Sequence, residues 1–216
     1  MVMALRLATR RSPATTAGRL RHLLAEPAQA DPQVTADLRA LHAEVLLQCG
    51  DLDGALDASV AAAHAAGTLH HRDWPRLITA LLISADLAVW AGHPHAVAAC
   101  DSTLSAFTGL DRPDPDRETV AAALHAVAVF HHTDAGHGYT LLDNLSRTVP
   151  QGPIDAMLAA GLAAMRTGPR VGGRPRHGVP PPVPGGVLQP RLDTTTAAYL
   201  ASRVHARPRH DQAVVS

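Results

Sequence analysis

The feature that most constrains this chain is a helical pattern of apolar residues that glycine interrupts at regular intervals. Before residue 167, apolar side chains recur at spacings of three, four and seven residues, which is the period of an amphipathic α-helix. The interrupting glycines, Gly50, Gly92 and Gly136, lie 42 and 44 residues apart. No run in the sequence alternates apolar and polar residues as a half-buried strand would. The pattern therefore predicts an all-α chain of about three helix hairpins that stack side by side.

The glycines lie between helices whose facing residues are mostly small or branched. Seven positions before the glycines stand Ala43, Ala85 and Val129, and shortly after them come Ala55, Ala96 and Leu141. Small side chains at such positions let two antiparallel helices approach to about 8–10 Å. We therefore expect residues 14–166 to form one helical domain, with its third turn at Gly136 and Gly138.

One stretch of the chain carries a known repeat pattern. Residues Ala43–Ala62, centred on the turn Gly50-Asp51-Leu52-Asp53-Gly54-Ala55-Leu56, resemble the tetratricopeptide (TPR) repeat, and looser matches follow around Gly92 and Gly136. The spacing of 42 and 44 residues exceeds the period of about 34 residues in a standard TPR. The resemblance covers residues 14–166. It implies a helix-hairpin solenoid similar to the sensor or scaffold segments of bacterial multidomain regulators.

The two ends of the chain differ in charge from its middle, although the formal net charge is +0. Residues 26–169 carry seven arginines and seventeen acids, whereas residues 170–216 carry seven arginines and two acids. Residues 1–25 carry five arginines and no acid, and we expect 1–13 to be a flexible basic segment. Residues 167–193 are rich in proline and glycine and predict a disordered linker. Residues 194–216 predict a short helix over 194–206 and a basic tail.

Composition and motifs exclude several classes of function. The chain lacks lysine, a Walker loop, a Gly-x-Ser-x-Gly elbow and a dinucleotide-binding glycine pattern, so we expect no enzyme, no cofactor and no metal. Cys49 and Cys100 lie in apolar helical patterns and are predicted to be buried and reduced. No apolar run reaches the roughly 18 residues that span a membrane, and the basic ends lack an element that reads nucleic-acid sequence. The lysine-free composition favours a bacterial, cytoplasmic protein.

The repeat register selects six residues for a binding groove. The resemblance to TPR proteins implies that the first helix of each hairpin lines the concave face. The candidate groove residues are then Glu44, Gln48, Asp86, Trp90, Phe130 and Asp134. Acidic and aromatic side chains attract arginine through charge and stacking. We therefore expect a non-enzymatic regulatory module that binds a protein or an Arg-rich peptide, with its own C-terminal tail as one candidate occupant.

Two alternatives stay open from the sequence. The first alternative is that the chain is the C-terminal fragment of a bacterial transcriptional regulator whose DNA-binding part is absent. It is suggested by the helix expected over 14–26, which has no predicted partner helix. A helical metal-dependent enzyme is the second alternative, with His131, His132 and Asp134 as its candidate residues. Two of the fourteen histidines, His125 and His132, lie two helical turns apart, about 10 Å, which is too far to share one metal ion.

Overall fold

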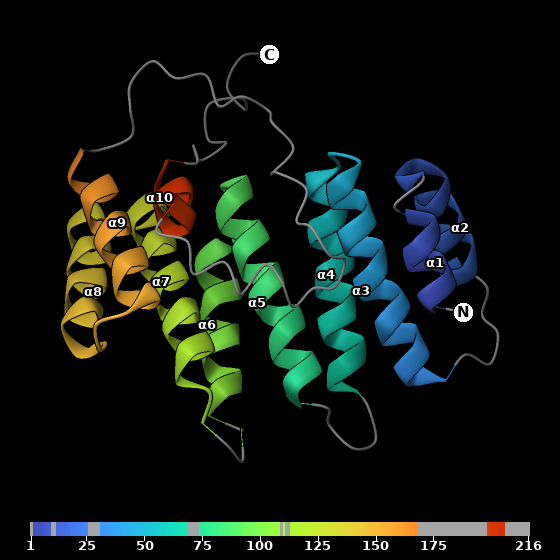
Figure 1. The fold of residues 1–216 in the computed structure, drawn as a ribbon, viewed down its shortest axis with the longest axis horizontal. Helices are drawn as coiled ribbons and strands as arrows, with labels where there is room; N and C mark the ends of the chain where they lie inside the picture. The colour runs from blue at the N-terminus through green and yellow to red at the C-terminus, as the bar shows by residue number, and fades with distance from the viewer. Residues whose placement is uncertain are drawn as a thin grey trace. The chain divides into compact units, whose positions relative to one another are not determined.

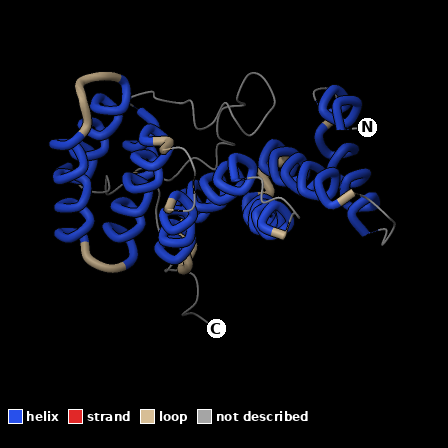
Figure 2. Tube along the Cα trace, turned by 90° about the horizontal axis from the view of Figure 1, so that it is seen from below, coloured by secondary structure: helices blue, strands red, loops and turns tan. Residues whose placement is uncertain are grey.

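The computed structural model describes residues 2–9, 12–25, 31–68, 74–108, 110, 113–167 and 198–205, and ten helices run through them (Figure 1). Every regular element in these residues is helical, and no strand is drawn among them (Figure 2). The all-α prediction is therefore confirmed. Thr167 ends a helix, and the remainder of the predicted linker, 168–193, lies outside the described residues together with 194–197 and the basic end from 206. The chain divides between Ser84 and Ala85 into two compact units, and each is described by itself.

The first unit contains α1 (Val2–Thr9), α2 (Pro13–Ala25), α3 (Pro32–Gln48), α4 (Leu52–Gly67) and the beginning of α5 (Trp74–Ala91). Alanines dominate the contact of α4 with α5: Ala62, Ala63 and Ala80 are buried, and Ala40, Leu77 and Leu81 pack around them. Small side chains of this kind allow helices to pack closely. Across α3 and α4, the Arg39 Nη1 atom donates to the Ala61 carbonyl oxygen at 3.2 Å.

Within the segment 1–13, for which the sequence predicts flexibility, Val2–Thr9 form the helix α1. It packs against α2 and α3, and Leu5 and Thr9 are buried in this contact. The Thr9 hydroxyl donates to the Leu5 carbonyl oxygen at 2.9 Å. The partner helix that the sequence did not predict for α2 is therefore α1, whose eight residues are too short a run to show a clear helical period.

The second unit contains the end of α5, then α6 (Ala96–Phe107), α7 (Pro115–His132), α8 (Ala135–Thr148), α9 (Pro153–Thr167) and α10 (Ala198–Val204). Helix α7 is its central element, because α6, α8, α9 and α10 all contact it. Its interior residues Ala123, Leu124, Ala126, Val127 and Ala128 are fully buried. Helix α10 lies within the range 194–206 for which the sequence predicts a short helix, and it packs against α9 and α7 (Figure 1).

Two turns between helices use a glycine in the left-handed region. Gly50 has a φ of 80° and Gly92 a φ of 61°, a conformation that glycine adopts without strain. The residue after each glycine donates its N–H to the carbonyl oxygen five residues earlier, from Asp51 to Leu46 and from His93 to Ala88. This pairing is the Schellman ending of a helix. The two turns therefore lie at the glycines that the sequence pattern indicated.

The third turn lies three residues earlier than the sequence predicts. The equivalent hydrogen bond runs from the Asp134 N–H to the Val129 carbonyl oxygen, so Thr133 stands where Gly50 and Gly92 stand. Gly136 and Gly138 belong to α8. A Cβ atom on Gly138 would lie 2.5 Å from the Phe130 backbone nitrogen, so this glycine, and not Leu141, permits the close approach of α7 and α8.

The two cysteines differ in exposure. Cys100 is buried on α6, and burial raises the pKa of its thiol to about 12. Cys49 is exposed, which contradicts the prediction that both are buried. The physical reason is its place at the C-terminal cap of α3, beyond the apolar stripe that the helix buries. Both thiols are free.

Candidate functional site

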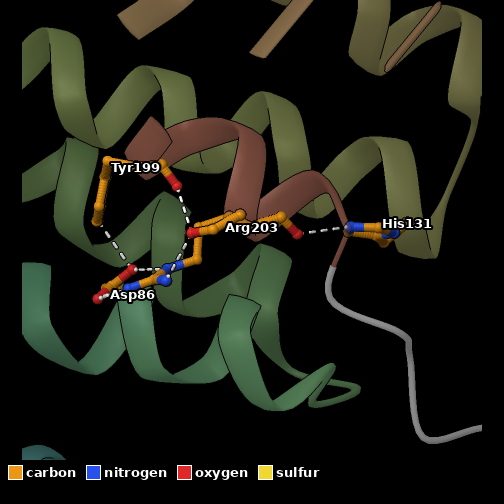
Figure 3. Close-up of polar contacts among 5 residues, drawn as sticks. Asp86, His131, Tyr199 and Arg203 are labelled. Atoms are coloured by element: carbon orange, nitrogen blue, oxygen red, sulfur yellow. Dashed lines mark hydrogen bonds and ion pairs between the residues drawn. The ribbon is translucent and has the colours of Figure 1, made fainter. Parts of the chain in front are cut away.

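The second unit holds a buried ion pair between Asp86 on α5 and Arg203 on α10 (Figure 3). The Arg203 Nε atom donates to Asp86 Oδ1 at 2.6 Å, and Nη2 donates to Oδ2 at 2.9 Å. Only 5 % of the Asp86 side chain and 11 % of the Arg203 side chain are exposed. Two parallel charge-assisted hydrogen bonds form the strongest geometry that a guanidinium and a carboxylate can adopt. The site therefore holds an arginine from a segment 117 residues away along the chain.

Aromatic rings surround the guanidinium group of Arg203. Its Cζ atom lies 4.4 Å from the centroid of the Trp90 ring and 4.8 Å from the centroid of the Tyr199 ring. Both distances lie within the range in which a cation is attracted to a π-system. Trp90 follows Asp86 by one helical turn on α5, so the two side chains share one face of that helix. One face of α5 thus supplies both the carboxylate and the ring that bind the arginine.

Tyr199 forms a further hydrogen bond with Asp86. Its hydroxyl donates to Asp86 Oδ1 at 2.8 Å, so this oxygen accepts from Tyr199 and Arg203 together (Figure 3). Burial and the neighbouring Asp86 carboxylate raise the pKa of Tyr199 well above its usual range. Burial lowers the pKa of Arg203, but the Asp86 carboxylate outweighs that effect, and the net shift is upward. Tyr199 therefore stays neutral and Arg203 stays charged, which suits binding and leaves no proton to exchange near neutral pH.

Apolar side chains anchor α10 beside the ion pair. Leu200 and Val204 have no exposed surface. Leu200 lies against Gly161 on α9, where an added Cβ atom would come within 2.5 Å of Leu200 Cδ2. The absence of a side chain at Gly161 therefore makes room for the leucine. Tyr199, Leu200, Arg203 and Val204 occupy one face of α10, at the helical spacing of four residues.

His131 on α7 contacts the C-terminal end of α10. Its Nε2 atom donates to the Arg203 carbonyl oxygen, with 3.0 Å between the two atoms (Figure 3). This carbonyl belongs to the last turn of α10, where no helical N–H is available to bind it. Burial lowers the pKa of His131, which favours the neutral ring with its proton on Nε2. The imidazole thus caps α10.

The six residues that the sequence nominates for a groove fall in different places. Glu44 is partly buried and Gln48 is exposed on α3, both in the first unit. In the second unit, the structure brings Asp86 and Trp90 together at Arg203. Phe130 packs edge to face against His131, with ring centroids 5.4 Å apart. The exposed Asp134 caps α8, where its carboxylate accepts from the His137 N–H at 2.7 Å.

The displaced third turn explains which residue the repeat register missed. Glu44 and Gln48 precede Gly50 by six and two residues, and Asp86 and Trp90 precede Gly92 in the same way. The residues six and two positions before Thr133, which ends α7, are Val127 and His131. The His131 side chain forms a hydrogen bond from α7 to the backbone of α10. The helix-ending hydrogen bond, and not the glycine, therefore defines the register of the third hairpin.

Sequence reasoning named the C-terminal tail as a candidate occupant but did not single out the residues of α10 that contact Asp86. It predicted a short helix over 194–206 but gave no role to Arg203. The available signal was a tyrosine and an arginine four residues apart on the apolar face of a helix, where a charged residue requires a buried counter-ion.

The residues named for a metal-dependent enzyme are used in other contacts. His131 binds the Arg203 carbonyl oxygen, and Asp134 caps α8. The His132 ring lies edge to face with that of His131, 6.3 Å between centroids. Within the described ranges, no three His, Cys, Asp or Glu side chains are grouped so that they could hold a metal ion.

Comparisons with known proteins found no matching protein-family model, curated protein or solved structure. None of the helices that the structure describes combines the length and apolar character needed to traverse a bilayer.

Proposed function

We propose that this chain is a non-enzymatic, TPR-like module that binds a protein or peptide partner through an arginine. The observation that carries the proposal is the bidentate pairing of Arg203 with Asp86 against the Trp90 ring. A carboxylate and a tryptophan on one helical face form a receptor for a guanidinium group. The arginine comes from a short helix that is remote in sequence, so the receptor and its ligand are separate segments of the chain.

The turns between helices support the TPR-like part of the proposal. The α3–α4, α5–α6 and α7–α8 turns share the same helix-ending hydrogen bond, at intervals of 42 and 41 residues. Asp51 and Asp134 then cap α4 and α8 by accepting from the backbone N–H three residues later. A repeated hairpin with a repeated ending is the basis of a helical solenoid, whose function depends on its surface residues.

The chemistry of the site favours binding over catalysis. Asp86 Oδ1 accepts two hydrogen bonds and Oδ2 accepts a third, so the carboxylate is engaged on both oxygens. A general base must have a free lone pair within reach of a substrate proton and a pKa near the working pH. Tyr199 and Arg203 keep their protons well above neutral pH. The arrangement therefore recognises a cation.

A peptide titration tests the proposal. In the full chain, Leu200→Asp with Arg203→Ala removes the internal ligand and opens the site. We expect a fluorescent peptide of residues 194–206 to bind this variant saturably, and to bind less tightly as salt is raised. Adding Asp86→Asn should abolish the binding, whereas adding Asp37→Asn should leave it unchanged. Binding that is absent, or that survives Asp86→Asn, would overturn the proposal.

A further inference from the structure

We propose that the partner is an amphipathic helix of another protein that displaces α10 from the Asp86–Trp90 site. This helix presents an aromatic residue, a leucine, an arginine and a branched apolar residue at the spacing of Tyr199, Leu200, Arg203 and Val204. The inference rests on the proposed function and adds the chemical class of the partner. It follows from how α10 satisfies each part of the site.

The polar and apolar contacts of α10 together fit a helical ligand. Tyr199 and Arg203 both donate to the same Asp86 oxygen. Four residues along an α-helix rise only about 6 Å and return to the same face. In an extended strand successive side chains point to opposite faces, so the neighbours Tyr199 and Leu200, which are both buried, could not both face the site. A flexible arginine-rich peptide therefore cannot reproduce the site's contacts unless it folds into a helix.

The apolar contacts restrict the residue that follows the aromatic one. Leu200 is fully buried and fills the space over Gly161, with Leu142 of α8 also close to that position. A smaller residue would leave a cavity there, and a charged one would be buried without a counter-ion. Val204 extends the same apolar edge by one turn and is also fully buried.

His131 restricts where the partner helix ends. Its Nε2 atom binds the carbonyl oxygen of Arg203, which is free because α10 ends at Val204. In the middle of a helix this oxygen would already accept the N–H four residues later. His131 therefore favours a partner helix that ends within one turn after its arginine, because the carbonyl oxygen there lacks a helical N–H.

The shortness of α10 makes displacement feasible. It spans seven residues, and a helix of that length is unstable alone in water. Part of the free energy that α10 gains on docking must therefore offset the unfavourable free energy of forming the helix. Its covalent connection to α9, through the 30 residues 168–197, favours the internal ligand by raising its local concentration. A partner helix that is already folded within its own protein does not lose binding free energy to helix folding. It can therefore compete with α10 despite the high local concentration of α10.

The test compares two helix-stabilised peptides of identical composition. The first carries residues 194–206, and the second moves Arg203 and Val204 one position toward the C-terminus. Both are titrated against the full chain with the site opened by Leu200→Asp and Arg203→Ala. A second opened form, Ser202→Pro, breaks α10 while leaving Asp86, Trp90 and Gly161 intact. We expect the first peptide to bind both opened forms at least about tenfold tighter than the second.

Displacement is measured in the full chain with an intact α10. Trp74→Phe leaves Trp90 as the only tryptophan, so its emission reports whether Arg203 is against the ring. We expect the first peptide to change this emission at higher concentration than it needs for the opened forms, and the second peptide to have no effect.

Each other outcome identifies the failing step. Equal binding of the two peptides would overturn the inference that the partner is a helix, but it would not contradict the proposed function. No binding of either peptide to either opened form would overturn both. A dimer of the intact chain in light scattering that is lost with Arg203→Ala would make a second copy the occupant and overturn the external partner.

Discussion

A bidentate arginine–aspartate pair is found in each unit of this protein, and the two pairs differ mainly in burial. In the first unit, Arg76 on α5 donates from Nε to Asp37 on α3 at 2.9 Å and from Nη2 at 3.4 Å. These side chains are 35 % and 32 % exposed. In the second unit, Arg203 and Asp86 are 2.6 Å apart and about nine-tenths buried. The same two residue types thus form a solvated surface contact in one unit and a desolvated one in the other.

The difference teaches what the surroundings of an ion pair contribute. An exposed pair gains little, because water and salt screen both charges. A buried pair loses the hydration of both ions and must recover it from other contacts. Asp86 recovers it from Arg203 and Tyr199, and Arg203 from Asp86 and the Trp90 ring. We therefore expect the buried pair to be specific for its partner and the exposed pair to tolerate substitution.

The largest expected effect separates the two aspartates. Asp86→Asn leaves Arg203 buried without its counter-ion, and we expect α10 to lose about 3–5 kcal/mol of local stability. Asp37→Asn should cost less than about 1 kcal/mol. Hydrogen exchange of the amides in 198–205 and around α3 measures the two effects. Equal losses at the two sites would show that burial does not distinguish the pairs.

A second comparison uses two helical glycines, one in each unit. Gly138→Ala would place a Cβ atom 2.5 Å from the Phe130 nitrogen and 2.6 Å from the Ala126 carbonyl oxygen. These are backbone atoms of α7, so we expect α7 and α8 to be forced apart at a cost of about 2–3 kcal/mol. Gly18→Ala meets no atom within 4 Å and should stabilise α2 by about 0.5–1 kcal/mol. Thermal unfolding followed by circular dichroism distinguishes the opposite signs, and a neutral Gly138→Ala would contradict the close contact.

The smallest effect concerns pH. Burial lowers the pKa of His131 in the second unit and of His42 in the first. Each histidine is therefore protonated more readily in the unfolded chain than in the folded one. The stability it contributes is complete above its ordinary pKa of 6.5 and is lost as pH falls from there toward the folded pKa.

Glutamine variants assign this pH dependence to a unit. Between about pH 7.5 and 5.5 we expect the wild-type α10 to lose up to about 1 kcal/mol of protection against exchange. His131→Gln keeps an N–H donor for the Arg203 carbonyl oxygen but cannot titrate, so it should remove the pH dependence at α10. His42→Gln should remove it only in the first unit. A dependence at α10 that persists in His131→Gln would exclude this histidine as its source.

Local sequence patterns were sufficient for the helices and for two of the turns. The apolar period and the positive-φ glycines Gly50 and Gly92 act over a few residues, so they can be read from the sequence. The third turn was misplaced, because Thr133 ends α7 without a glycine and Gly138 serves packing inside α8. The register nominated Asp86 and Trp90, but no local pattern pairs Asp86 with Arg203, 117 residues later. That pairing follows from which helices pack together.

The most direct test of the account is a double-mutant cycle on the buried pair. Asp86→Leu and Arg203→Met are made singly and together in the full chain, and the exchange of the amides in 198–205 reports the docking of α10. Each single variant leaves one buried charge, whereas the double variant leaves none. We expect a coupling free energy of about 2 kcal/mol or more, against less than about 1 kcal/mol for the equivalent cycle on Asp37 and Arg76. Additive effects at Asp86 and Arg203, with a coupling below about 0.5 kcal/mol, would contradict the claim that this site is built to hold an arginine.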